Sequence, residues 1–136
     1  MALHLLKLAV GVDDIDQLRR VRAARIKERG GNWVWTRNRP RRGAEVLAGG
    51  SIYWVIRGQI RVRQRVLGFR SGRDDGGRRY CLIDVDEALV ATEWRSCRPF
   101  QGWRYLVPDA APPDRPGGGA TPPDRMLVEL RGLGLI

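Results

Sequence analysis

Residues 51–69 constrain the fold more than any other part of the chain, because they predict a β-hairpin. Residues 51–57 are a run of β-branched and aromatic side chains, which favour strands. Gly58 and Gln59 predict a two-residue turn, since glycine adopts positive φ without strain. In residues 60–69 apolar and basic side chains alternate, which is the pattern of a strand with two different faces.

Further short strands are expected on both sides of this hairpin. They fall at residues 3–10, 33–37, 80–85 and 89–97, with a loop at 70–79 and a short final strand after an ordered loop at 98–105. A sheet of such strands has exposed edges unless it closes on itself. We therefore expect an α+β fold: a small mixed, mostly antiparallel β-barrel with two or three flanking helices.

The first helix is expected to begin after Asp13 or Asp14, either of which can cap it, and to end at Gly30. Its apolar stripe is interrupted by Arg22 and Arg25. We expect these two arginines to extend along the packed face and to place their charged ends at its rim.

The chain is expected to form one domain at residues 1–106, with a second short helix at 40–47. Residues 107–124 are rich in proline and glycine, which predicts a flexible segment. Residues 125–136 predict a C-terminal helix that docks back on the domain.

The net charge of +10 is concentrated in the middle of the chain. Residues 17–104 hold 21 basic and 8 acidic residues, whereas the segments on either side are slightly acidic. Such an excess suggests a polyanionic partner, and arginine binds phosphate through two parallel hydrogen bonds. Codon bias in a G+C-rich genome would also favour arginine over lysine, so both explanations stay open.

Few residues suit conventional catalysis or metal binding. His4 is the single histidine and Cys81 and Cys97 are the only cysteines, which excludes a four-ligand Cys/His zinc site. Glycine-rich phosphate motifs are absent, and we expect no cofactor and no metal. Asp84 and Asp86 form the best acidic pair, on one face of a strand, although a solvated strand end explains them more simply.

No apolar stretch is long enough to cross a membrane, and residues 1–11 lack the features of a secretion signal. We therefore expect a cytoplasmic protein with reduced cysteines.

The first candidate for binding phosphates is an arginine ladder on the second strand of the hairpin. Arg61, Arg63 and Arg65 share a face at a spacing of roughly 6.6 Å, comparable to that of successive phosphates. The neighbouring strand adds Arg57, Tyr53 and Trp54. Charges suit the backbone of single-stranded RNA, and aromatic faces suit its bases. A solvated face paired with carboxylates across the sheet explains the pattern equally well.

Two more candidates lie outside the hairpin. One is a basic run before the second helix, whose N-terminus also favours anions: Arg37, Arg39, Arg41 and Arg42. The other is the aromatic loop, which holds Arg98, Phe100, Trp103 and Arg104. The first, taken alone, is somewhat more typical of a solvated charge run than of an anion site. The aromatics of the second would either plug a barrel end or stack an unpaired base.

The chain resembles a family of small bacterial proteins recorded only as a conserved domain of unknown function. The segments that carry this resemblance are MALHLLKLAVG, TRNRPRR, GGSIYWVIRGQIRVRQRVL, RPFQGWRYL and LRGLGLI. Residues 47–55, with the helix before and the arginine-rich strand after, are similar to the PUA-like barrels, including the ASCH and EVE groups. That resemblance implies a PUA-like barrel with an RNA-binding or modified-base-binding cleft, although Ser51 stands where an acidic residue is common and the ASCH-type Gly-x-Lys motif is missing.

The sequence thus predicts a non-enzymatic nucleic-acid-binding module, with RNA as the first choice, DNA as the second and no membrane partner. One alternative is an enzyme that modifies nucleotides or nucleic acids, with Asp84 or Asp86 as acid/base or metal ligand. The other is a protein-interaction module whose arginine surface meets an acidic partner.

Overall fold

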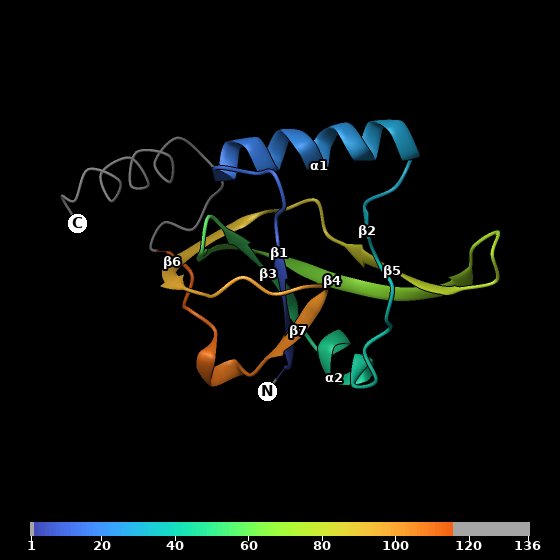
Figure 1. Cartoon of the computed structure of the whole chain (residues 1–136). Coiled ribbons are helices and arrows are strands. Elements are labelled where there is room, and N and C mark those ends of the chain that lie inside the picture. The colour runs from blue at the N-terminus through green and yellow to red at the C-terminus, as the bar shows by residue number, and fades with distance from the viewer. Residues whose placement is uncertain (1, 116–136) are drawn as a thin grey trace.

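The computed structural model describes residues 2–115, which form an open mixed sheet with helix α1 lying across it (Figure 1). The strands are β1 (His4–Leu8), β2 (Trp33–Thr36), β3 (Ser51–Ile56), β4 (Gln59–Arg73), β5 (Arg79–Val85), β6 (Val90–Ser96) and β7 (Trp103–Leu106). The helices are α1 (Ile15–Arg29), the short α2 (Gly43–Leu47) and a 3-10 turn, η1 (Pro108–Ala110).

The strand order is β2-β5-β4-β3-β1-β7, and β6 pairs with β4 beside this path. Only β1 and β3 are parallel among the described pairs. The α+β class is therefore confirmed, but the predicted closed barrel is wrong. Strand β4 is 15 residues long and pairs with β3 and β6 along its first half and with β5 along its second. The end strands β2 and β7 pair only with β5 and β1 within the described residues, so the sheet stays open.

The predicted boundaries of helix α1 are confirmed. The Asp14 carboxylate accepts a hydrogen bond from the backbone N–H of Gln17, and Gly30 ends the helix with a positive φ of 72°. The predicted position of Arg22 at the rim is wrong, because its side chain is buried. Its guanidinium donates to the side-chain oxygen of Asn32 at 2.6 Å and to the carbonyl of Trp33 at 3.0 Å, which supplies partners in the core.

The predicted hairpin is confirmed, but its turn is shifted by one residue. Arg57 and Gly58 form the turn, with positive φ values of 50° and 77°. Two positive φ values are required by a type I′ turn, whose twist matches that of the flanking strands. Strands β4 and β5 also extend into residues 70–79, where a loop was expected, so that only residues 74–78 connect them.

The main core lies between α1 and the sheet. A smaller cluster contains the alternate residues of β3, Tyr53 and Val55, so every residue of β3 is buried. The first part of the proline-rich segment packs on the domain as well. After η1, the Glu93 N–H donates to the carbonyl of Pro113, and the Arg115 N–H donates to the carbonyl of Ala91 in β6. The rest of that segment and the expected C-terminal helix lie outside the described residues. Within residues 2–115, none of the helices has the length and apolar character needed to cross a bilayer.

Candidate nucleic-acid interface

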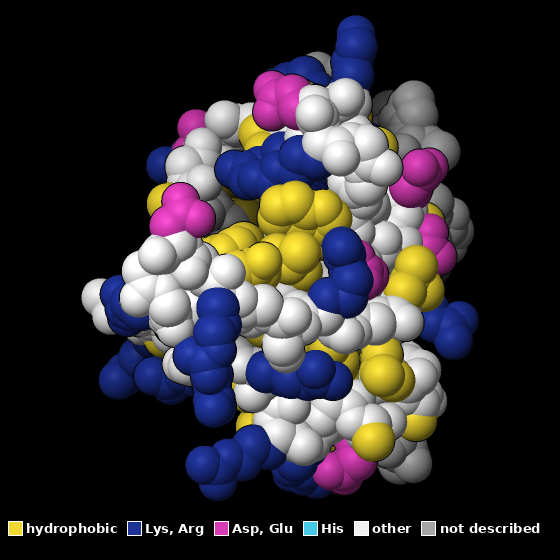
Figure 2. All heavy atoms as spheres, turned by 90° about the vertical axis from the view of Figure 1, so that its right-hand side faces the viewer, with side chains coloured by type: hydrophobic (Ala, Val, Ile, Leu, Met, Phe, Trp, Pro, Cys, Tyr) yellow, Lys and Arg dark blue, Asp and Glu magenta, His cyan; other side chains and the backbone are white. Residues whose placement is uncertain are grey.

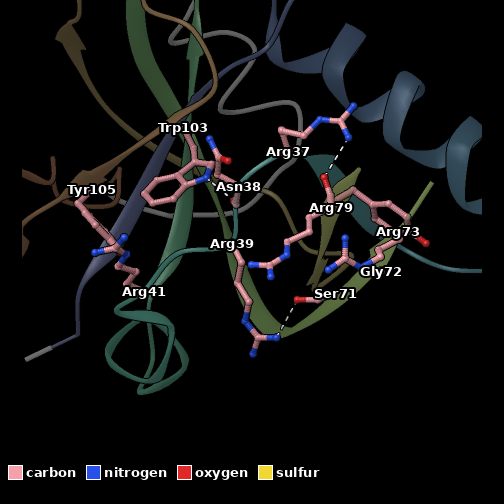
Figure 3. Close-up of a pocket in the computed structure, with 11 residues that line it drawn as sticks. Arg37, Asn38, Arg39, Arg41, Ser71, Gly72, Arg73, Arg79, Trp103 and Tyr105 are labelled. Carbon is pink, nitrogen blue, oxygen red and sulfur yellow. Dashed lines mark hydrogen bonds between the residues drawn. The ribbon is translucent and has the colours of Figure 1, made fainter. Parts of the chain in front are cut away.

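A pocket of about 840 Å³ opens where the loop after β2 faces the ends of β4, β5 and β7 (Figure 3). Its walls carry five arginines, three aromatic rings and three smaller residues. They are Arg37, Arg39, Arg41, Arg73, Arg79, Tyr80, Trp103, Tyr105, Asn38, Ser71 and Gly72. The pocket therefore combines positive charge with aromatic surface.

Two aromatic residues of β7 hold the basic loop in place. The indole N–H of Trp103 donates to the carbonyl of Asn38 at 2.7 Å. The hydroxyl of Tyr105 accepts from the backbone N–H of Arg42 at 3.0 Å. The two rings also pack edge to face, with centroids 4.8 Å apart. The loop is thus fixed at both ends, and this positions Arg39 and Arg41 at the pocket.

Most of the positive charge in the pocket has no acidic partner among residues 2–115. Arg37 is the exception, because its guanidinium lies 3.2 Å from the carboxylate of Asp74. Arg39 donates to the Ser71 hydroxyl at 3.0 Å, and Arg73 donates to the Gly77 carbonyl at 2.9 Å.

The guanidinium groups of Arg41 and Arg79 have no hydrogen-bond or ion-pair partner among the described residues. Four of the five arginines in the pocket therefore have no carboxylate partner within residues 2–115. Positive charges gathered in a concave site raise the local concentration of anions and favour binding of phosphate.

The tyrosine of β5 closes one side of the pocket. Tyr80 lies opposite Gly72 in the β4–β5 pairing. A Cβ atom at Gly72 would lie 2.5 Å from the Tyr80 ring, so a larger residue there would push the ring from its place over β4. This ring and that of Trp103 are half-buried and present faces on which a base can stack.

The predicted ladder of Arg61, Arg63 and Arg65 does not form one solvent face, because β4 is a central strand. Arg61 is buried at 7% exposure, with its guanidinium 4.0 Å from the centre of the Trp94 ring, and burial lowers its pKa. Arg63 makes two hydrogen bonds to the carboxylate of Asp114, at 2.6 and 2.7 Å. Only Arg65 is exposed. The alternation in sequence was real, but one of its faces is covered by other parts of the fold.

The other predicted contacts are spread over the molecule. Trp54 is buried and donates to Gln64, so it offers no stacking face. Tyr53 is buried against His4. Phe100 lies beneath Arg104, whose guanidinium is 5.1 Å from the ring centre.

The remaining predicted arginines also lie outside the pocket walls. Arg42 forms an ion pair with Glu45 at 2.5 Å. Arg57 and Arg98 are exposed.

Neither acidic residue of the enzyme hypothesis lines the pocket. The Asp84 carboxylate accepts two hydrogen bonds from Arg70, at 2.7 and 2.9 Å. The Asp86 carboxylate accepts one from the backbone of Ala88. Within residues 2–115 there is no cluster of three metal-binding side chains.

A second pocket of about 400 Å³ contains two predicted contacts, Tyr53 and Arg63. Asp114 neutralises the arginine there, so this pocket carries little free positive charge.

Sequence reasoning identified Arg37, Arg39, Arg41 and Trp103 but missed their partners in the pocket. Arg73, Arg79 and Tyr80 were assigned to a loop or to a strand without function. The sequence RSGRDDGGRRY has arginines on both sides of its central turn, and this pattern could have indicated them. If the segment forms a hairpin, Arg73 and Arg79 lie opposite each other.

The comparisons with known proteins agree with the resemblance of the whole chain. A family model described as "Protein of unknown function (DUF1489)" matches residues 5–136. No curated protein and no solved structure matches the chain, so the resemblance to PUA-like barrels gains no support. The chain belongs to the DUF1489 family, whose function is unknown.

Proposed function

We propose that this protein binds single-stranded nucleic acid, with RNA as the first choice, in the pocket between the loop 37–42 and strands β4, β5 and β7. The observation that carries the proposal is the group of four guanidinium groups around one concave site that have no carboxylate partner within residues 2–115. Trp103 and Tyr80 add stacking faces at the same site.

The size of the pocket favours unpaired nucleotides over a duplex. A volume of about 840 Å³ is within the range of sites that enclose small molecules. It can hold one or a few nucleotides whose bases are free to reach the aromatic rings. A duplex would present its phosphates to a broader surface and keep its bases stacked inside.

We also propose a cytoplasmic location, which the free thiols of Cys81 and Cys97 support.

The test is the affinity for a fluorescently labelled 12-nucleotide single-stranded RNA, measured by anisotropy at about 50 mM salt. We expect Arg39→Glu/Arg41→Glu to weaken binding by at least about tenfold, because charge reversal replaces attraction to phosphate by repulsion. The matched control is Arg57→Glu/Arg98→Glu, which changes the net charge equally at exposed positions outside the pocket. We expect it to weaken binding by less than about threefold.

Three outcomes overturn the proposal. The first is wild-type binding no tighter than that of a scrambled basic peptide. The second is an equal loss in the two double variants, which would mean that net charge alone causes binding. The third is that a mononucleotide competes as well as the 12-mer at equal nucleotide concentration, which would make the site one for free nucleotides.

A further inference from the structure

Strand β2 carries two tryptophans on the face that points away from the core. Val34 and Thr36 are buried at 5% and 4% exposure, so Trp33 and Trp35 point to the opposite face of the strand. Trp35 is 45% exposed, and Leu82 lies opposite it in β5. Figure 2 shows the side of the molecule that carries β2 and the end of α1, where hydrophobic side chains gather between Lys and Arg side chains.

Arginines surround these tryptophans. The guanidinium of Arg29, in the last turn of α1, lies 4.0 Å from the centre of the Trp33 ring. The guanidinium of Arg37 lies 4.7 Å from the centre of the Trp35 ring. Asp84 lies opposite Trp33, but the two hydrogen bonds from Arg70 neutralise its charge. The face is thus aromatic with a guanidinium at each end, that of Arg37 being paired with Asp74. Such a face suits an anionic partner with flat rings.

Arg37 joins this face to the pocket. Its guanidinium lies over the Trp35 ring, and the same residue lines the pocket. Hydrogen bonds to the carbonyl of Arg79 at 2.9 Å and to the carboxylate of Asp74 hold it there. A strand of nucleic acid leaving the pocket past Arg37 therefore meets Trp35 first.

We infer that Trp35 stacks a base of the strand whose phosphates the pocket holds, and that Trp33 offers the next stacking position along β2. This inference rests on the proposed function. Residues two apart on a strand are separated by roughly 6.6 Å, which is close to the distance between successive nucleotides of an extended strand. The flanking arginines favour a nucleic acid over an apolar protein surface at this face.

The test compares the affinities of Trp35→Ala and of the wild type for two ligands. One is an 8-nucleotide RNA. The other is an oligomer of equal length in which only the two nucleotides at one end keep their bases. We expect the variant to bind the intact RNA about tenfold more weakly, because each stacked base contributes measurably to affinity. The wild type should bind the abasic oligomer at least as weakly as the variant binds intact RNA. The variant should lose much less affinity than the wild type when the bases are removed, because only Trp33 remains to stack one. Leu47→Ala, at a side chain of similar exposure (42%), should leave both affinities unchanged.

Two further variants separate stacking from a loss of folding. Trp35→Phe should keep most of the affinity for intact RNA. Trp35→Leu should lose as much affinity as Trp35→Ala, because leucine is apolar but has no aromatic ring on which a base can stack. The inference is overturned if Trp35→Ala binds intact RNA as the wild type does, or if it weakens both ligands equally. Failure of the proposed function looks different: Arg39→Glu/Arg41→Glu would then leave RNA binding intact, or the wild type would not bind RNA at all.

Discussion

The contribution of each arginine depends on its partner. Arg63 is held by Asp114 and Arg22 by backbone and amide oxygens, so these two stabilise the fold. Arg41 and Arg79 have no such partner among residues 2–115, and their charge is available to a ligand. A count of basic residues cannot make this distinction, because it depends on which side chains the fold brings within hydrogen-bond distance.

The single histidine provides a direct test at the residue scale. Burial, and to a lesser extent the positive charge of Arg63, lower the pKa of His4 below its ordinary value of 6.5. Its Nδ1 atom also accepts a hydrogen bond from the backbone N–H of Ser51 at 3.1 Å, which requires that this nitrogen carry no proton. The ring signals in a proton NMR titration should therefore have a midpoint below 6.5.

The same shift has a consequence for stability. The unfolded chain takes up this proton at a higher pH than the folded chain does, so the free energy of unfolding falls as the pH drops below about 6.5. A midpoint at or above 6.5 would show that His4 is more exposed to solvent than the structure has it.

At the scale of elements, the sequence contains enough information to locate most helices and strands. Asp14 and Gly30 mark the ends of α1, and the β-branched residues of 51–56 mark β3. The full length of β4 could not be predicted, because residues 70–73 have the composition of a loop and become a strand only through pairing with β5. The burial of Arg61 was missed for a related reason: alternation shows two faces but not whether both are covered.

The turn between β3 and β4 should become more stable when Arg57 is replaced by asparagine. Arg57 has a φ of 50°, which is unfavourable for most side chains, and asparagine tolerates it better. We expect Arg57→Asn to raise the free energy of unfolding by roughly 0.5–1 kcal/mol in urea titrations. Arg57→Val should lower it, since a β-branched residue is strained at positive φ. A gain with valine would contradict the turn described here.

The junction between α2 and β3 depends on Gly50. A Cβ atom there would lie 2.1 Å from the carbonyl oxygen of Leu3 and 2.6 Å from that of Val46, and these backbone atoms cannot move aside easily. Gly50→Ala should lower the free energy of unfolding by about 3 kcal/mol. The control is Gly76→Ala, where the nearest atom is 3.5 Å from the added Cβ, and it should change stability by less than about 1 kcal/mol. Equal effects of the two substitutions would contradict the packing at Gly50.

At the scale of the whole molecule, the open sheet is what creates the candidate site. Strand β7 begins beside the loop that follows β2, so Trp103 can hold this loop near the β4–β5 hairpin. In a closed barrel, β2 and β7 would have further strand partners. The charge run at residues 37–42 was recognised in the sequence, but the opposite wall was not, because Arg73 and Arg79 meet it only through the pairing of β4 with β5.

The central claim is that the pocket arginines contact phosphates, and the salt dependence of RNA binding tests it most directly. For single strands, the logarithm of the association constant falls with the logarithm of salt concentration by about 0.7 per neutralised phosphate. Arg39→Gln/Arg41→Gln should therefore reduce the magnitude of this slope by about 1.4 relative to the wild type, whereas Arg57→Gln/Arg98→Gln should leave it unchanged. Equal slopes for the wild type and the pocket variant would contradict the account.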